Sequence, residues 1–300
     1  MHPKLPSRFF ASLSLLPQLV LAQGSTLQPV HVDSGRVTVS GSSLYYEAAG
    51  RGPTIILLHA GSLDRRIWDD QFQALARSYR VIRYDARGHG RSGPATERFD
   101  RSHDLAALMQ GLRISRAALI GSSLGGATAI DFALAHPDRV TRLVLVGSGL
   151  SGYRWPAESR DTPWRVVARA AAAKSDTFGI ARSWLQSDYF AAARENPALA
   201  ARLDTLLAEN VEVWRGSLQR GPQDSVFAEP ALSRLSQLRA PTLIVVGDRD
   251  ILDIHRIADT LRVYLPQART KVLDGVGHLP SMERPVLFLR LVSEFLASKK

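Results

Sequence analysis

The chain has 300 residues, of which 45% are hydrophobic and 22% are charged, so it can build one large domain or two smaller ones. This composition excludes a wholly disordered or fibrous protein. The formal net charge is +10, but the arginines are spread along the chain among acids, as at Asp138-Arg139, so we expect no nucleic-acid partner.

The residue types argue against metal and redox centres. Because the chain has no cysteine, it has no disulfide, cysteine-ligated zinc or iron–sulfur cluster. The 8 histidines form no HExxH motif or other compact ligand array, so we expect no bound metal.

The first 22 residues have the layout of a secretory signal peptide. They contain two basic residues and no acid, with an apolar run from Phe9 to Leu16. Val20 and Ala22 are suitable small residues for cleavage before Gln23, which predicts export to the periplasm or the exterior. An uncleaved anchor is the alternative, but a proline interrupts the apolar stretch, and we expect no stable membrane span.

Short apolar runs alternate with helical patterns along the rest of the chain. Arg36–Val39 and Leu44–Ala48 flank a Ser-Gly-Ser-Ser segment and predict a β-hairpin. Six later runs predict strands buried on both faces, and the segments between them predict helices. This alternation indicates an α/β fold with a mostly parallel, doubly wound sheet. The six runs are Thr54–His59, Arg80–Asp85, Ala117–Ser122, Leu143–Gly147, Thr242–Gly247 and Thr270–Leu273, and the helices include Trp68–Ser78, Asp104–Gly111 and Leu124–Ala135.

An insertion at residues 151–232 interrupts the alternation. Its alanine-rich runs and prolines predict several short helices, which suit a cap, or lid, over a pocket. The predicted organisation is therefore a signal peptide at 1–22, a core at 23–150 and 233–300, and this cap. The aromatic residues of the cap either line the pocket or fill the cap's own small core. Four of the five tryptophans lie in the cap: Trp155, Trp164, Trp184 and Trp214.

A GxSxG pattern at residues 121–125 lies between a predicted strand and a predicted helix. This is the setting of a nucleophile elbow, in which Ser123 adopts a strained backbone conformation that exposes its hydroxyl. Gly121 and Gly125 give the turn the room it needs. We expect Ser123 to be the catalytic nucleophile.

A serine nucleophile needs a base and an acid that orients the base. His278 and Asp250 each follow a predicted parallel strand, and the carboxyl ends of such strands meet at one edge of a sheet. We expect His278 to be the base and Asp250 the acid. Asp248 and Asp253 are alternatives for the acid, the first near its strand and the second near the next helix.

The tetrahedral intermediate of such a reaction needs two backbone donors for its oxyanion. Leu124, which follows the nucleophile, supplies one amide. The loop after the first buried strand supplies the other, and we expect the Gly61 amide to be that donor. His59 in the same loop is expected to brace the loop rather than to act as a base.

A second glycine pattern at residues 147–152 matches the GxGxxG dinucleotide fingerprint. Prolines follow it where the fingerprint requires a helix, so we interpret this segment as a turn into the cap. We expect no cofactor.

Two further motifs carry a family resemblance. Residues 85–92 match DxRGxGxS, and residues 136–145 match HPxRVxRLVL. With the elbow, the acid and the base, they make nearly the whole mature chain resemble the α/β-hydrolase family of capped esterases, lactonases, carbon–carbon bond hydrolases and cofactor-independent haloperoxidases. The resemblance implies a helical cap inserted after the sixth strand. The usual HG of the oxyanion loop is His59-Ala60 here, as in some enol-lactonase relatives.

The family resemblance also implies an activity. Haloalkane dehalogenases and soluble epoxide hydrolases of this fold use an aspartate at the elbow, so Ser123 argues against both. We expect hydrolysis of small to medium, largely apolar esters or lactones through an acyl-enzyme. The alternatives are carbon–carbon bond hydrolysis, haloperoxidase or perhydrolase chemistry, and a ligand-binding or signalling protein with little turnover. The sequence supports no prediction of oligomeric state.

Overall fold

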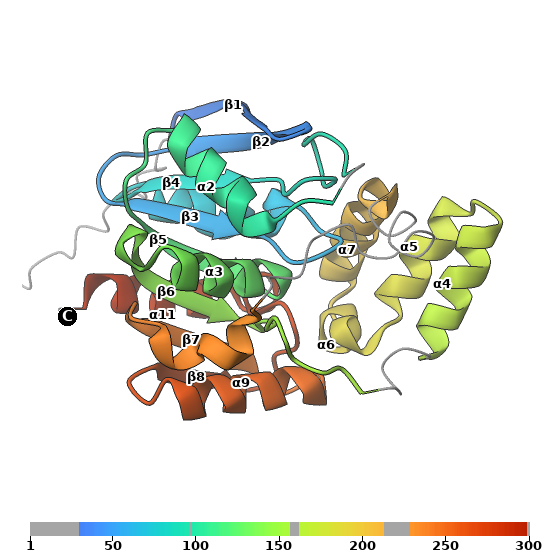
Figure 1. Ribbon diagram of the computed structural model, residues 1–300. Helices are drawn as coiled ribbons and strands as arrows, with labels where there is room; N and C mark the ends of the chain where they lie inside the picture. The colour runs from blue at the N-terminus through green and yellow to red at the C-terminus, as the bar shows by residue number, and fades with distance from the viewer. Residues whose placement is uncertain (1–29, 96–97, 157–161, 213–228, 299–300) are drawn as a thin grey trace, which may run out of the picture.

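The computed structural model describes residues 30–95, 98–156, 162–212 and 229–298. In these residues, eight strands form one sheet in the order β1-β2-β4-β3-β5-β6-β7-β8 (Figure 1). β2 runs against both of its neighbours, and all pairs from β4 to β8 are parallel. The strands are β1 (Val32–Val39), β2 (Ser42–Ala49), β3 (Thr54–Leu58), β4 (Arg80–Tyr84), β5 (Ala117–Ser122), β6 (Val140–Val146), β7 (Thr242–Gly247) and β8 (Arg269–Leu273).

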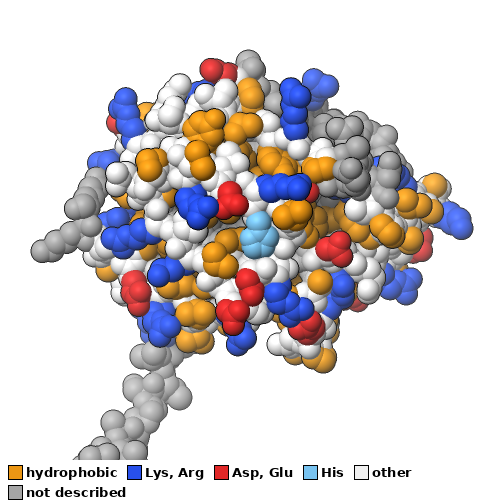
Figure 2. Space-filling view, turned by 90° about the horizontal axis from the view of Figure 1, so that it is seen from below, with side chains coloured by type: hydrophobic (Ala, Val, Ile, Leu, Met, Phe, Trp, Pro, Cys, Tyr) orange, Lys and Arg blue, Asp and Glu red, His pale blue; other side chains and the backbone are white. Residues whose placement is uncertain are grey.

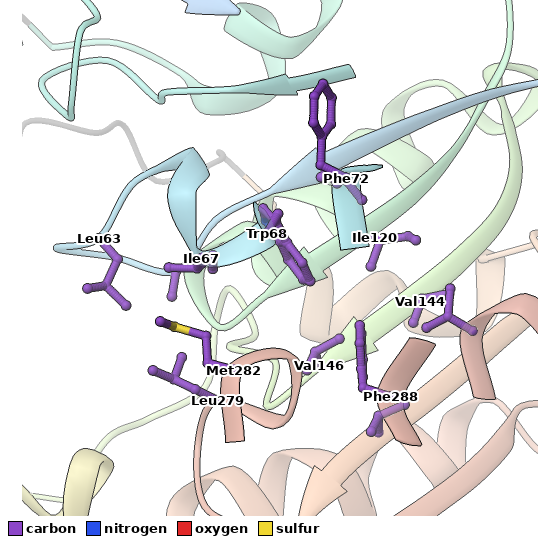
Figure 3. Close-up of a cluster of buried hydrophobic side chains, with 14 of the residues drawn as sticks. Leu63, Ile67, Trp68, Phe72, Ile120, Val144, Val146, Leu279, Met282 and Phe288 are labelled. Atoms are coloured by element: carbon purple, nitrogen blue, oxygen red, sulfur yellow. The ribbon is translucent and has the colours of Figure 1, made fainter. Parts of the chain in front are cut away.

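Side chains alternate between the two faces of the sheet along each central strand, and here they are apolar on both faces. Helices therefore cover both faces. In β3, Ile55 and Leu57 belong to one buried cluster, and Ile56 and Leu58 belong to the other. Figure 3 shows part of the first cluster, where the Trp68 and Phe288 ring centroids are 6.1 Å apart. The first face is covered by α1 (Asp69–Leu75) and α11 (Pro285–Ala297), and the second by α2 (Arg101–Gly111), α3 (Leu124–Ala135) and α9 (Leu252–Tyr264).

Most predicted elements are confirmed, and several bounds are corrected. The predicted bounds of β5, β7 and α3 match the structure. The second predicted helix starts at Arg101 rather than at Asp104, because the Asp100 carboxylate caps it by accepting from the Ser102 and His103 amides at 2.7 and 3.2 Å. The first predicted helix, Trp68–Ser78, is shorter in the structure, since a 3₁₀ turn ends at Trp68 before α1 and α1 ends at Leu75. β6 starts three residues before the predicted Leu143.

The prediction that β8 is buried on both faces is wrong. β8 is an edge strand, so helices and a neighbouring strand cover only part of it. Four of its five side chains are partly or fully exposed, and only Leu273 is buried.

The inserted segment forms helices beyond the carboxyl ends of the parallel strands, at the right of Figure 1. The Trp184 ring packs against Trp164 and Phe190, with centroids 4.2 and 5.7 Å away, and both Trp184 and Phe190 belong to the buried cluster on the first face of the sheet. Trp214 and the predicted signal peptide at 1–22 lie outside the described residues. The cap helices are α4 (Pro163–Ala173), α5 (Thr177–Leu185), α6 (Ala191–Arg194) and α7 (Pro197–Glu209).

Hydrogen bonds link the last of these helices, α7, and the residue that follows it to the core. The Asn210 amide donates to Asp64 Oδ2 at 2.8 Å, and its oxygen accepts from the Gly90 N–H at 2.7 Å. Arg202 donates to the Arg66 carbonyl at 2.6 Å. Burial of Asp64 is more than offset by hydrogen bonds from Arg66 and Asn210, so the pKa of its carboxyl lies well below the usual value.

The two chain segments that enter and leave the cap are joined to each other and to α3. The Ser151 hydroxyl donates to Asp131 Oδ1 at 2.6 Å and accepts from the Ala231 amide at 2.8 Å. The Leu232 amide donates to the Ser151 carbonyl at 3.1 Å. Asp131 is on α3, the helix that begins after the GxSxG turn, so this junction links the cap to the elbow.

On the face in Figure 2, basic, acidic and apolar side chains are interspersed, in line with the spread of charge along the sequence. None of the helices in the part of the chain that the structure describes is long and apolar enough to cross a membrane.

The junction at Asp131 predicts a pH-dependent stability. Burial raises the pKa of Asp131 to about 6, so above that pH the folded state must hold a charge that it disfavours. This penalty is present at pH 7.5 and disappears as the pH falls from about 6 towards 4. Asp131→Asn, which keeps an acceptor for Ser151, is expected to raise the free energy of unfolding by about 1–3 kcal/mol at pH 7.5 and by much less at pH 4.5.

Urea unfolding of both proteins at the two pH values measures this difference. Asp138→Asn is the matched control, since Asp138 is exposed just beyond the same helix. A gain from Asp131→Asn that is equal at both pH values would contradict the prediction.

Candidate active site

Ser123 occupies a strained turn between β5 and α3. Its backbone has φ 50° and ψ −111°, which non-glycine residues rarely adopt. Three backbone hydrogen bonds hold it there: its amide donates to the Val146 carbonyl at 2.9 Å, and its carbonyl accepts from the Gly149 and Ala127 amides at 2.9 and 3.1 Å. Ser123 is only half-buried, at the start of the helix.

The glycines on either side of Ser123 permit this turn. A Cβ atom on Gly121 would lie 2.4 Å from the Gly125 carbonyl oxygen, and one on Gly125 would lie 2.3 Å from the Leu58 carbonyl oxygen. Both distances are far shorter than a van der Waals contact, so neither position accepts a side chain without backbone movement. The second contact also shows that α3 starts directly against the end of β3.

Asp250 and His278 meet above the ends of β7 and β8. His278 Nδ1 is 3.0 and 2.9 Å from the two Asp250 oxygens, and both side chains are buried. An ionised carboxylate only accepts hydrogen bonds, so Nδ1 carries the proton and Nε2 carries the lone pair. The Ile251 amide also donates to Asp250, at 2.8 Å. This is the arrangement that a general base requires.

The two alternative acids have other partners. Asp248 accepts from the Val276 amide at 3.1 Å and so supports the loop before His278. Asp253 lies in α9, where it accepts from the Tyr153 hydroxyl at 2.6 Å. Of the three carboxylates, Asp250 is therefore the one that bonds to His278.

The loop after β6 contacts both Ser123 and the Asp250–His278 pair. Gly149 in this loop bonds to the Ser123 carbonyl. Two residues earlier, a Cβ on Gly147 would lie 3.1 Å from both Asp250 Oδ2 and His278 Nδ1. Because β5, β6, β7 and β8 are consecutive in the sheet, a segment of three residues spans the distance from the elbow to the pair.

The two expected oxyanion donors are neighbours. A Cβ on Gly61 would lie 3.5 Å from Leu124 Cδ2 and 3.7 Å from Leu124 Cβ. As the first residue of α3, Leu124 has an amide with no acceptor inside its own helix. Both ring nitrogens of His59 bond to the backbone: Nδ1 bonds to the Ala60 carbonyl and Nε2 accepts from the Ala86 amide, both at 2.8 Å. His59 therefore supports this loop.

Tyr189 is a site residue that the sequence reasoning missed. It lies in a 3₁₀ turn of the cap (Asp188–Phe190), and its ring meets the His278 imidazole edge to face, with centroids 4.7 Å apart. Burial and the Asp250 charge raise the pKa of its hydroxyl well above the usual value, so Tyr189 is neutral. The aromatic content of the cap was visible in the sequence, but no pattern distinguished Tyr189 from its neighbours.

The site has the elements of acyl transfer. Within the described ranges, no three His, Asp or Glu side chains are grouped so that they could hold a metal ion. A serine at a sharp turn, an imidazole with its lone pair on Nε2 and two adjacent amides together suit attack on a carbonyl carbon.

Comparisons with known proteins agree with the fold described above. The model of the alpha/beta hydrolase fold family matches residues 53–285. A 2-hydroxy-6-oxononadienedioate/2-hydroxy-6-oxononatrienedioate hydrolase from Paraburkholderia xenovorans is 29% identical over 92% of this chain and 97% of its own. A pimeloyl-[acyl-carrier protein] methyl ester esterase from Nitrosomonas europaea is 26% identical over 83% and 97%. The structure of Est816, an N-acyl homoserine lactone degrading enzyme, has 30% identity and a TM-score of 0.72, covering 87% of this chain and 100% of its own.

The close contacts at the elbow predict a sharp difference between two glycines. Gly125→Ala places its methyl group against the Leu58 carbonyl and is expected to lower the free energy of unfolding by about 3 kcal/mol or more. Gly149→Ala, also beside Ser123, places its methyl group 3.5 Å from the nearest atom and should change stability by less than about 1 kcal/mol. Denaturant unfolding of both variants tests this, and equal losses would contradict the contacts described here.

Proposed function

The chain belongs to the alpha/beta hydrolase fold family, and we propose that it is a serine hydrolase that cleaves carboxylic esters or lactones. Ser123 is the nucleophile, His278 the general base and Asp250 the acid that orients it. The observation that carries the proposal is the bond from His278 Nδ1 to Asp250, which leaves Nε2 as the acceptor at the same sheet edge as the Ser123 turn.

In the proposed reaction, Ser123 Oγ attacks the carbonyl carbon while His278 Nε2 takes its proton. The electron pair of the carbonyl bond moves onto the oxygen, and the Gly61 and Leu124 amides stabilise this oxyanion. The tetrahedral intermediate collapses, and His278 gives the proton to the departing alcohol oxygen. Water then attacks the acyl-enzyme with His278 again as the base, which releases the acid and restores Ser123.

The proposed substrates are small to medium and largely apolar. Tyr189 brings an aromatic ring from the cap onto His278, and the buried Trp184 packs behind it, with ring centroids 5.4 Å apart. An aromatic surface next to the base favours apolar acyl or alcohol groups through burial of their surface. The ester and lactone activities in the names of the esterase and of Est816 support the same class of bond.

Carbon–carbon bond hydrolysis is the second candidate. It is favoured by the 29% identity, over almost the full length of both chains, to the hydrolase from Paraburkholderia xenovorans. A panel of nitrophenyl esters of graded acyl length, several lactones and a 2-hydroxy-6-oxo dienedioate separates the two candidates. Turnover of esters or lactones alone supports the proposal, turnover of the dienedioate alone favours the second candidate, and the absence of any turnover favours a binding protein.

Export, proposed from the sequence of residues 1–22, is tested separately. Mass spectrometry of the protein recovered from a secreting host should give a mature chain that begins at Gln23. An intact N-terminus would contradict the cleavage site.

The roles in the triad predict that two substitutions each cause a large loss of activity. Ser123→Ala removes the attacking oxygen and should lower kcat for the best substrate by about 10⁴-fold or more. Asp250→Asn should also lower kcat by about 10⁴-fold, because an amide group no longer holds the proton on Nδ1 and His278 adopts the wrong tautomer. Asp248→Asn, which changes the same chemical group two residues earlier, is the control and should retain far more activity. Activity that survives Ser123→Ala would exclude the serine mechanism.

A further inference from the structure

Glu283 holds the loop that carries His278. Its Oε2 accepts from the Gly277 amide at 2.6 Å, and its Oε1 accepts from the Leu279 amide at 2.8 Å. One carboxylate therefore binds the peptide N–H groups on both sides of His278. Glu283 ends the short helix α10 (Pro280–Glu283), which follows this loop.

Other residues hold the part of the loop that precedes His278. Asp248 accepts from the Val276 amide, and the Arg249 amide donates to the Val276 carbonyl at 2.9 Å. A Cβ on Gly277 would lie 2.9 Å from Ala192 Cβ in the cap and 3.2 Å from Glu283 Oε1. The backbone next to His278 is thus packed between the cap and the Glu283 carboxylate.

A carboxylate is suited to this position because it has two oxygens that only accept hydrogen bonds. Burial raises the pKa of Glu283 above its usual value, although the hydrogen bonds from the Gly277 and Leu279 amides act in the opposite direction. The Asp250 charge also raises it and His278 lowers it, so Glu283 interacts electrostatically with both members of the pair.

We propose that Glu283 is a positioning residue for catalysis: it fixes the backbone on both sides of His278 and adds a negative charge that favours the imidazolium formed when His278 takes a proton. This inference rests on the proposed function, because it assigns a role in the same site. Glu283 acts through His278 and does not contact the substrate.

The test variant is Glu283→Gln, which keeps the size of the side chain. The amide carbonyl can accept from one of the two backbone N–H groups, but the NH₂ group faces the other, and the charge is lost. We expect kcat to fall by about 10-fold to 100-fold with KM changed by less than about 2-fold, because His278 is displaced while the substrate pocket is intact.

The second readout is the titration of the His278 imidazole, followed by NMR and assigned with a His278→Gln variant. In Glu283→Gln the titration midpoint should move to lower pH, because the imidazolium loses a neighbouring negative charge. Glu294→Gln, the same substitution at an exposed position of α11, should leave kcat and the midpoint unchanged. A lower melting temperature with an unchanged midpoint and kcat would reduce Glu283 to a structural cap and overturn the proposal.

Glu283→Asp keeps the charge but shortens the side chain, so it separates the two effects and provides a second variant if Glu283→Gln does not fold. It should retain the wild-type midpoint more closely while kcat stays low. If its midpoint shifts as far as that of Glu283→Gln, or if its kcat equals that of the wild type, the proposal is wrong.

The two readouts also separate this proposal from the proposed function. If the wild type turns over no ester or lactone but Glu283→Gln still shifts the midpoint, the proposed function fails and the positioning of His278 by Glu283 stands. If the wild type is an active serine hydrolase and Glu283→Gln changes neither kcat nor the midpoint, the positioning role alone fails.

Discussion

The close approach of backbone to backbone at the turn between β5 and α3 is the constraint on which the site depends. Ser123 is held at a positive φ, and neither neighbouring glycine has space for a Cβ atom. Such a turn costs conformational energy, which is offset by the hydrogen bond that the Ser123 amide donates to Val146 and by those that its carbonyl accepts from Gly149 and Ala127. As a result, α3 starts against the end of β3, and the Gly61 loop lies beside the side chain of Leu124.

The order of the strands in the sheet places the other residues of the site next to this turn. Four consecutive parallel strands end at the same edge, so the loops after β5, β6, β7 and β8 are neighbours in space although they are far apart in sequence. Gly147 lies within reach of both Asp250 and His278, where a side chain would crowd the pair. The geometry of the base and the acid thus depends on strand register as much as on the residues themselves.

The inserted helices also contact the loops at this edge. The cap segment from Asp188 to Glu195 touches both loops of the pair: Tyr189 lies on His278, Ala192 is close to Gly277, and Glu195 accepts from Arg249 at 2.7 Å, one residue before Asp250. These contacts, with the junction at Ser151 and Asp131, give the cap several links to the loops that carry the polar groups. Changes in the cap should therefore affect the position of His278 as well as the shape of the pocket.

The sequence by itself indicated the alternation of strands and helices, the elbow, His278 as the base and three candidate acids, because each depends on local patterns: short apolar runs, small residues around a serine, and polar residues directly after strands. Only the tertiary structure decided that β8 is an exposed edge, that Tyr189 reaches His278 and that Glu283 bonds on both sides of it. These features depend on which strand has a neighbour and which cap residue meets which loop, and such contacts between distant segments leave no periodic pattern in the chain.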